Sequence, residues 1–214
     1  MLEHYNPMLS AIRALDPTAH IAGGAVRDTL LERPIKDIDV FLHDAHTDEA
    51  ASLLRSEFGF VKVGEWKQYL GFSDPVIARL ARFEKADEVT PVCLIGLTHK
   101  VRGIRDNLAR FDFGICQAAW DGEEVCTAPE YRKDIEAKTF TLHRADNYRQ
   151  FAYSMSRFDK ITMDRYAGWR IVVPKEFKKL ADEYELRKTH YRDYDSGEWR
   201  PRDLGPQQLT PKAR

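Results

Sequence analysis

Residues 22–41 read AGGAVRDTLLERPIKDIDVF, and this stretch decides how the rest of the sequence is interpreted. Asp37 and Asp39 alternate with apolar residues in a run typical of a β-strand, so both side chains project from the same face. Two like charges held this close are unfavourable unless a cation lies between them. Carboxylate oxygens suit a hard dication such as Mg²⁺. The pattern therefore predicts a metal site.

Gly23 and Gly24 lie just ahead of the acidic pair and open a helical pattern. A Gly-Gly turn leaves backbone N–H groups unobstructed, and the N-terminus of the following helix provides a favourable field for phosphate. A phosphate-binding turn next to metal-binding carboxylates indicates nucleoside triphosphate (NTP) chemistry. The alternative is a plain turn followed by aspartates that cap a loop.

Composition narrows the class of protein. The chain has 214 residues, 43% of them hydrophobic, which is enough for one substantial core. A net charge of -1 excludes nucleic-acid binding through bulk positive charge, so any such binding depends on a local patch. Cys93, Cys116 and Cys126 form no CxxC pair, which favours buried thiols in a reducing compartment. Without a leader pattern or a long apolar run, the protein is expected to be soluble and cytoplasmic, with no membrane partner.

Hydrophobic periodicity predicts the remaining elements. Helices are expected over 8–15, 26–32, 47–58, 101–108, 148–167 and 175–186. Strands are expected over 37–42, 60–63, 67–72, 76–83, 89–97, 113–120 and 124–127, with a hairpin turn at Asp121-Gly122. This order predicts an α+β fold, in which a small mixed β-sheet with flanking helices is followed by a short helical C-terminal extension.

The segment GGAVRDTLLERPIKDIDVFL, residues 23–42, resembles the nucleotidyltransferase signature of the DNA polymerase β-like superfamily. The resemblance is closest to the head domain of CCA-adding enzymes and bacterial poly(A) polymerases. In that branch a Gly-Gly-x-Val-Arg-Asp turn precedes Asp-x-Asp, and all of these positions are matched by Gly23, Gly24, Val26, Arg27, Asp28, Asp37 and Asp39. Both halves occur in the right order, which makes the match more specific than either half alone.

This resemblance implies a polymerase β-like fold and an enzyme that transfers a nucleoside monophosphate from an NTP to an acceptor hydroxyl. It implies Mg²⁺ or Mn²⁺ as the cofactor, held by Asp37 and Asp39, which are the expected catalytic residues. It assigns the triphosphate to Gly23 and Gly24. The expected domains are a catalytic domain over 1–145, a helical extension over 146–190 and a charged tail over 191–214 that contains prolines.

The family also places a third carboxylate on a neighbouring strand. Residues 92–97 are the first place to look, and they contain no acid. Asp112, in the segment RFDFGICQ, is the predicted third metal ligand and catalytic residue, because an acid is unexpected at the start of an apolar run. The alternative is that Asp112 caps a helix or pairs with Arg110. Without a third acid, a non-catalytic protein that binds nucleotide or RNA and retains the fold becomes the rival.

Six further charged residues are expected to bind the nucleotide. Arg27 and Asp28 lie within the signature and Lys36 lies just before Asp37, whereas Arg149, Arg157 and Lys160 are interleaved with aromatic residues. For each, the alternative is a solvated surface residue. His43 and His46 are interpreted as part of a surface loop, because they lack the further ligands of a zinc site.

The acceptor is the least determined part. The resembled branch favours an RNA 3′ end of tRNA-like type as the partner, with ATP or another NTP as the donor. The chain after residue 145 is too short for the long helical regions that hold tRNA in that branch, so CCA addition as such is not expected. Nucleotidylation of a protein or small-molecule hydroxyl is the alternative, since the net charge gives no strong nucleic-acid footprint.

Overall fold

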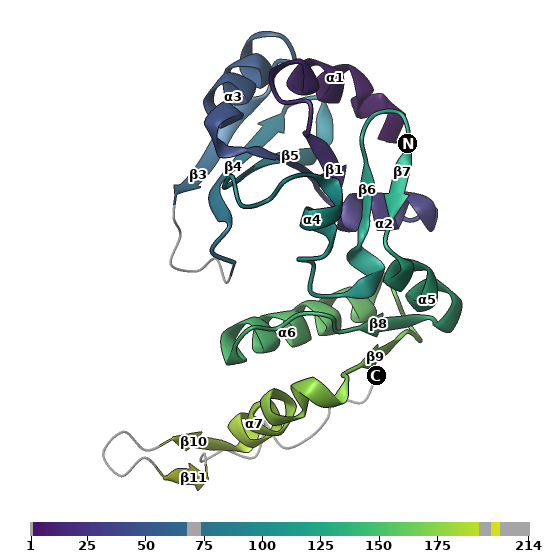
Figure 1. Ribbon diagram of the computed structural model, residues 1–214, viewed down its shortest axis with the longest axis vertical. Helices are drawn as coiled ribbons and strands as arrows, with labels where there is room; N and C mark the ends of the chain where they lie inside the picture. The colour runs from purple at the N-terminus through teal and green to yellow at the C-terminus, as the bar shows by residue number, and fades with distance from the viewer. Residues whose placement is uncertain (1, 68–73, 193–197, 202–214) are drawn as a thin grey trace.

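A computed structural model describes residues 2–67, 74–192 and 198–201. At its centre is a seven-stranded sheet in the order β3-β4-β5-β2-β1-β6-β7 (Figure 1). β2 and β5 pair in parallel, and the other neighbours pair antiparallel. The strands are β1 His20–Ala22, β2 Ile38–His43, β3 Val61–Lys67, β4 Ile77–Lys85, β5 Glu88–Leu97, β6 Ala118–Trp120 and β7 Val125–Thr127. The predicted α+β fold with a mixed sheet is confirmed.

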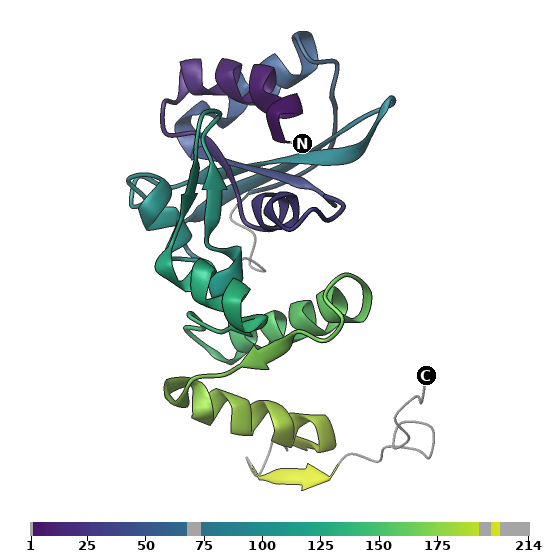
Figure 2. The same ribbon diagram turned by 90° about the vertical axis from the view of Figure 1, so that its right-hand side faces the viewer.

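Two helices lie together on one face of the sheet, α1 (Asn6–Leu15) and α3 (Thr47–Ser56) (Figure 2). The apolar residues of each recur at helical spacing and are buried in the main core against alternate residues of β2 and β5. Short 3₁₀ turns precede these helices, at Leu2–Tyr5 and Asp44–His46. In the chain, α2 (Gly24–Leu30) connects β1 to β2. All three helices were expected from the sequence.

The other face of the sheet carries a smaller apolar cluster. Phe41 and Leu97 pack there with Leu108 of α4 (Ile104–Leu108). Asp39 lies two residues before Phe41 on the same strand, so its side chain is on this second face as well. The helix predicted over 101–108 is shorter than expected and begins only after Gly103.

The part of the chain that follows β7 lies below the sheet in Figures 1 and 2. It contains a parallel pair of strands joined across α6, with α7 packed on α6. Its elements are α5 Pro129–Ala137, β8 Thr139–Thr141, α6 Tyr148–Asp164, β9 Arg170–Val172, a 3₁₀ turn at Lys175–Phe177, α7 Lys178–Thr189, β10 His190–Arg192 and β11 Trp199–Pro201. β10 and β11 form an antiparallel pair in the described part of the tail.

The main core crosses the expected boundary between head and extension. Phe140 has its ring centroid 5.5 Å from that of Phe113, 5.5 Å from that of Phe158 and 5.8 Å from that of Trp169. Phe113, Phe140 and Phe151 belong to the same buried cluster as the helices on the first face of the sheet. The division at residue 145 therefore stays a prediction, with one continuous core on both sides of it.

Two expected strands are wrong in extent. The strand over 113–120 is instead a 3₁₀ turn at Gly114–Cys116 followed by β6, because the Asp134 carboxylate accepts a bond from Ile115 N at 2.8 Å and bends the chain there. The strand over 60–63 is part of the longer β3, and the strand expected over 67–72 lies, except for Lys67, outside the described residues. α5 was not expected, because only Tyr131 and Asp134 of its residues are buried and its apolar periodicity is weak.

Cys93 and Cys116 are buried and Cys126 is half-buried, and all three are free thiols. Over the part of the chain that the structure describes, no helix combines the length and the apolarity needed to cross a lipid bilayer.

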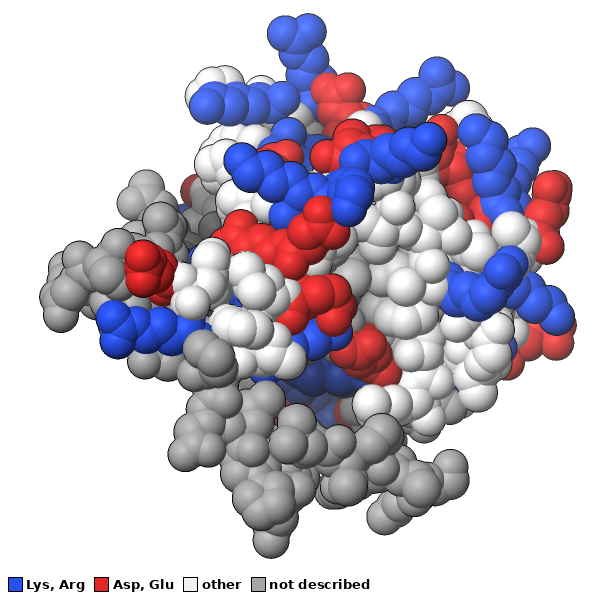
Figure 3. All heavy atoms as spheres, turned by 90° about the horizontal axis from the view of Figure 1, so that it is seen from below, with Lys and Arg blue, Asp and Glu red and all other residues white. Residues whose placement is uncertain are grey.

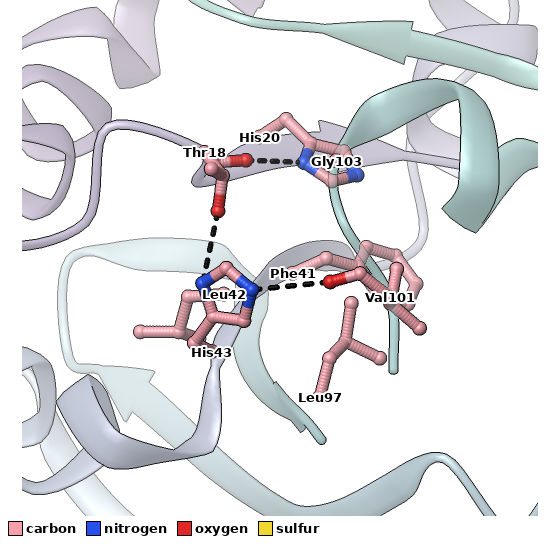
Figure 4. A pocket seen from close by; sticks show the side chains of 8 residues that line it. All are labelled: Thr18, His20, Phe41, Leu42, His43, Leu97, Val101 and Gly103. Carbon is pink, nitrogen blue, oxygen red and sulfur yellow. Dashed lines mark hydrogen bonds between the residues drawn. The ribbon is translucent and has the colours of Figure 1, made fainter. Parts of the chain in front are cut away.

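His20 and His43 line a small cavity at the end of β2 (Figure 4). The His20 ring accepts or donates at both nitrogens, with Nδ1 2.8 Å from Thr18 O and Nε2 2.9 Å from the side-chain nitrogen of Asn107. His43 Nε2 lies 3.1 Å from Val101 O. The cavity has a volume of about 10 Å³, which is room for a single water. The expectation that His43 lies in a surface loop is wrong, because His43 is the last residue of β2 and is half-buried.

His20 makes the protein sensitive to acid. Burial lowers the pKa of its imidazole to about 4, from an ordinary value of 6.5. A lowered folded-state pKa contributes stability that is present above pH 6.5 and is lost as pH falls towards 4. The expected loss from this one group is roughly 3 kcal/mol. Urea unfolding from pH 7 to pH 4, with His20→Gln as the control, measures it; equal pH slopes for the two proteins would contradict the assignment.

Candidate active site

The glycine turn is built by backbone geometry that side chains disfavour. Gly23 has φ 81° and ψ -128°, and its N–H donates to Ala118 O at 2.9 Å. A Cβ on Gly23 would lie 2.6 Å from Cε1 of Phe111. Gly24 begins α2 in an ordinary helical conformation, and a Cβ there would come no closer than 3.7 Å to the Arg27 guanidinium. Gly23 is therefore required for its backbone conformation, whereas Gly24 leaves the N-terminus of α2 without a side chain over it.

Substitution of the two glycines by alanine is expected to have unequal effects. Gly23→Ala combines a positive φ with a clash against Phe111, and we expect it to lower the free energy of unfolding by about 2 kcal/mol or more. Gly24→Ala is expected to change it by less than about 1 kcal/mol, because the position is helical and has space. Chemical denaturation of both variants checks this, and equal losses would contradict the conformational argument.

Asp37 and Asp39 form the predicted acidic pair. Asp39 is in β2 and Asp37 directly precedes it, and both are partly buried. Burial raises the pKa of the Asp39 carboxyl to about 7, and the charge of Asp37 raises it further in the same direction. The positive charges of Arg157 and Lys36 oppose this shift. The pair is therefore electrostatically unfavourable as it stands, which is what the sequence pattern predicted for a cation site.

Cys93 occupies the strand position beside Asp39. The two residues are Cα partners in the parallel β2–β5 register, so their side chains share a face. Burial raises the pKa of the Cys93 thiol to about 12, with further contributions from the charges of Asp39 and Asp37. Arg82 of β4 pairs with Cys93 in register and opposes that shift. The strand searched for a third acid thus presents a protonated thiol next to Asp39.

Asp112 lies elsewhere in the site, bound to α6. Its carboxylate accepts from Arg157 Nη1 at 3.0 and 3.1 Å, from Ser154 Oγ at 2.8 Å and from the N–H of Phe113 at 3.0 Å. The Asp112 charge is also the main cause that raises the pKa of Arg157. The positive charge of Arg157 also opposes the rise in the pKa of Asp39, so Arg157 interacts with both acids. These contacts favour a role for Asp112 in placing Arg157, and its role as a metal ligand stays a prediction.

The structure does not bring three ligands together. Within residues 2–67, 74–192 and 198–201, no three His, Cys, Asp or Glu side chains are grouped so as to hold a metal ion. Asp37 and Asp39 still fit a dication in part, because they are two carboxylates close enough for the charge of one to raise the pKa of the other. Oxygen atoms of the nucleotide phosphates are the natural further ligands for Mg²⁺ at such a site.

The remaining predicted residues fall into two groups. Arg27 and Asp28 are 1% and 2% exposed and are hydrogen-bonded to each other and to Tyr166, so neither faces solvent as a surface pair. Lys36, Arg149 and Lys160 are exposed. Lys36 is close enough to influence Asp39, whereas no contact described for Arg149 or Lys160 links them to the acidic pair.

Sequence reasoning missed Cys93, Ser154 and Tyr166 as parts of the site. Strand alternation over 92–97 could have placed Cys93 on the face of Asp39, once the parallel pairing of β2 with β5 was known. Ser154 and Tyr166 carry no local signal, because their partners Asp112 and Asp28 are 42 and 138 residues away.

The chain is similar to CCA-adding enzymes in sequence and in fold. The CCA-adding enzyme of Streptococcus pyogenes serotype M5 (strain Manfredo) is 26% identical over 185 residues, which are 86% of this chain and 43% of that protein. Among solved structures, the Thermotoga maritima CCA-adding enzyme complexed with tRNA has a TM-score of 0.57 at 18% identity, covering 87% of this chain and 43% of that one. The Bacillus stearothermophilus CCA-adding enzyme in complex with CTP has a TM-score of 0.54 at 20% identity, covering 78% and 40%.

The fold and the sequence likeness define a relative of the nucleotidyltransferase head domain of CCA-adding enzymes. The chain spans less than half the length of the relatives that it matches. It belongs to the Gabija anti-defense 2 family, whose sequence profile matches residues 3–138. That match contains the glycine turn, the acidic pair and Asp112, and it ends before α6.

Proposed function

We propose that the chain is a metal-dependent nucleotidyltransferase that moves a nucleoside monophosphate from an NTP to an acceptor hydroxyl. The observation that carries this proposal is the acidic pair: Asp39 lies in β2, Asp37 directly precedes that strand, and the charge of Asp37 helps to raise the pKa of the Asp39 carboxyl. The strained Gly23 turn at the N-terminus of α2 supports it, because the turn and the pair are the two halves of the resembled signature. Relatedness to the CCA-adding head domain supports the same chemistry.

Each side chain has a role in this proposal. Asp37 and Asp39 hold Mg²⁺ or Mn²⁺, which when bound lowers the pKa of the acceptor hydroxyl and stabilises the charge on the departing pyrophosphate. Gly24 binds the triphosphate through its backbone N–H at the start of α2, and Gly23, whose N–H donates to Ala118 O, shapes the turn. Arg157, oriented by Asp112, adds positive charge next to the acidic pair. Lys36 does the same from the connector ahead of Asp37.

An RNA 3′ end of tRNA-like type is the first candidate for the acceptor. Solved structures of similar fold include a tRNA nucleotidyltransferase complexed with a primer tRNA and an incoming ATP analogue, and a tRNA-processing enzyme with CTP, which supports this acceptor. The extension over 146–190 holds ten lysines and arginines against seven acids, a modest excess of positive charge. A cytoplasmic location is part of this proposal, since NTPs, RNA and reduced thiols are found together there.

A protein hydroxyl is the second candidate acceptor. Figure 3 shows the molecule from below, where basic and acidic side chains are interspersed without one continuous basic area. The family name describes proteins that act against a defence system called Gabija, and covalent nucleotidylation of a defence protein is a direct way to inactivate it. This alternative needs no surface for a long RNA.

Labelled transfer distinguishes the acceptors. Each NTP, labelled at the α-phosphate, is incubated with Mg²⁺ or Mn²⁺ and either total RNA or cell protein, beside an Asp37→Ala, Asp39→Ala variant. Label on RNA that is lost in the variant supports the first acceptor, and label on protein that is lost in the variant supports the second. No label with any NTP in either mixture would favour a binding protein that retains the fold.

A further inference from the structure

The Arg27–Asp28 pair is in contact with the two residues that directly follow α6, Arg165 and Tyr166. Tyr166 follows α6 closely in the chain and is fully buried. Its hydroxyl accepts a hydrogen bond from Arg27 Nε at 2.8 Å and donates one to Asp28 Oδ1 at 2.6 Å. Arg165 forms an ion pair with the other carboxylate oxygen, Asp28 Oδ2. Two adjacent residues of the extension thus bind the two residues that complete the glycine-turn signature.

The ring of Tyr166 contacts a second part of the signature. The Arg27 guanidinium carbon lies 4.8 Å from the ring centroid, and that of Arg33 lies 4.1 Å from it. Arg33 begins the connector that leads to Asp37, and its N–H donates to Asp28 O at 2.7 Å. The same side chain therefore touches both α2, which follows the glycine turn, and the connector to the acidic pair.

Arg27 transmits this contact to the glycine turn. Its backbone N–H donates to Gly23 O at 3.0 Å, and its Nη2 is the nearest atom to the Cβ position of Gly24, at 3.7 Å. A charge buried to this extent is stable only with its partners in place, so the guanidinium cannot shift without the Asp28 and Tyr166 contacts breaking. Through Arg27, Tyr166 therefore restricts movement of the glycine turn.

We propose that Tyr166 is a positioning residue for the nucleotide site, assisted by Arg165. The inference rests on the proposed function, because the turn it supports is the one assigned to the triphosphate. Held by Tyr166, the turn and the connector are ordered before the nucleotide binds, so the nucleotide does not have to order them. Loss of the hydroxyl is expected to weaken nucleotide binding through this loss of order rather than through a lost contact with the nucleotide.

Tyr166→Phe is the most conservative test, because the ring and its contact with Arg33 remain. A non-hydrolysable NTP analogue is titrated with Mg²⁺ into the full chain by calorimetry, and the thermal unfolding midpoint is measured beside it. We expect the Kd to rise about fivefold or more, as for loss of a hydrogen bond between charged or buried groups. In transfer assays the KM for NTP rises while kcat stays within about threefold, since the group does not touch the reacting atoms.

Two further variants make the result decisive. Arg165→Gln removes the contact to Asp28 Oδ2 from a side chain that is 19% exposed, and we expect the same direction of change. Tyr184→Phe removes a hydroxyl from α7, where the ring packs on Phe151, and is expected to bind the analogue like the parent. If Tyr166→Phe does not fold, Arg165→Gln decides the question.

The outcomes separate this inference from the proposed function. If the parent binds the analogue and both Tyr166→Phe and Arg165→Gln match its Kd, the positioning role is refuted and the proposed function stands. A loss of folded protein with an unchanged Kd for the folded fraction refutes it in the same way. If the parent itself does not bind the analogue, both the proposed function and this inference fail.

Discussion

Replacement of Asp39 by asparagine is expected to reduce nucleotidyl transfer by about a thousandfold or more, without loss of stability. The amide removes a charged oxygen donor from a two-carboxylate site, and charge stabilisation at the transferred phosphate is among the largest contributions to such catalysis. The neighbouring strand β5 offers no acid as a substitute, because Cys93 is the strand partner of Asp39 there. Steady-state transfer of an α-labelled nucleotide at saturating NTP and metal measures the loss.

The stability half of this prediction is unusual for an active-site variant. The raised pKa of Asp39 means that its charged form is disfavoured in the folded state, and this cost grows as pH rises from 3.8 towards 7. At pH 8 and without metal, Asp39→Asn is therefore expected to unfold at the parent's denaturant concentration or a higher one. Asp87→Asn, at an exposed residue, is the matched control for activity. If Asp39→Asn transfers nucleotide at a rate within tenfold of the parent's, Asp39 is not a catalytic residue.

Replacement of Arg27 by alanine is expected to have the largest effect on folding, a loss of about 3 to 5 kcal/mol. Arg27 is 1% exposed and donates to Asp28, Tyr166 and the sulfur of Cys116. Its removal leaves the buried Asp28 carboxylate with one fewer positive partner and creates a cavity beside Tyr166. Urea unfolding with a linear extrapolation measures the change.

The double variant Arg27→Ala, Asp28→Ala shows whether the cost comes from the stranded charge. Because the carboxylate is absent, the double variant is expected to be clearly more stable than the sum of the two single changes predicts. Additive losses would mean that the two side chains act independently, contrary to the short contact of 2.6 Å between Arg27 Nη2 and Asp28 Oδ1.

The parts of the site that sequence predicts are those encoded locally. Strand alternation is enough to predict Asp37 and Asp39 on one face, and two glycines are enough to predict a turn at the start of α2. The same reasoning finds most elements of the sheet, because each strand or helix carries its own periodicity. α5 escapes it, since a helix with few buried residues lacks that periodicity.

Side-chain partners distant in the sequence could not be predicted. From the sequence, Arg27 and Asp28 are expected to bind nucleotide, with a solvated first-turn pair as the alternative, and their burial depends on the distant Tyr166. Asp112 is predicted as a metal ligand, and its partners Arg157 and Ser154 come from the distant α6. In both cases tertiary packing decides the environment of a charge, and periodicity contains no information about it.

The most direct test of the central claim compares two labels on one NTP. The parent and the Asp37→Ala, Asp39→Ala variant are incubated with metal, RNA and cell protein, and with NTP labelled at either the α- or the γ-phosphate. If the protein is a nucleotidyltransferase, the parent attaches the α-label to an acceptor and releases the γ-label as pyrophosphate. The variant without the two aspartates does neither. Attachment of the γ-label, or α-label transfer that persists in the variant, would contradict the assignment of Asp37 and Asp39 to this chemistry.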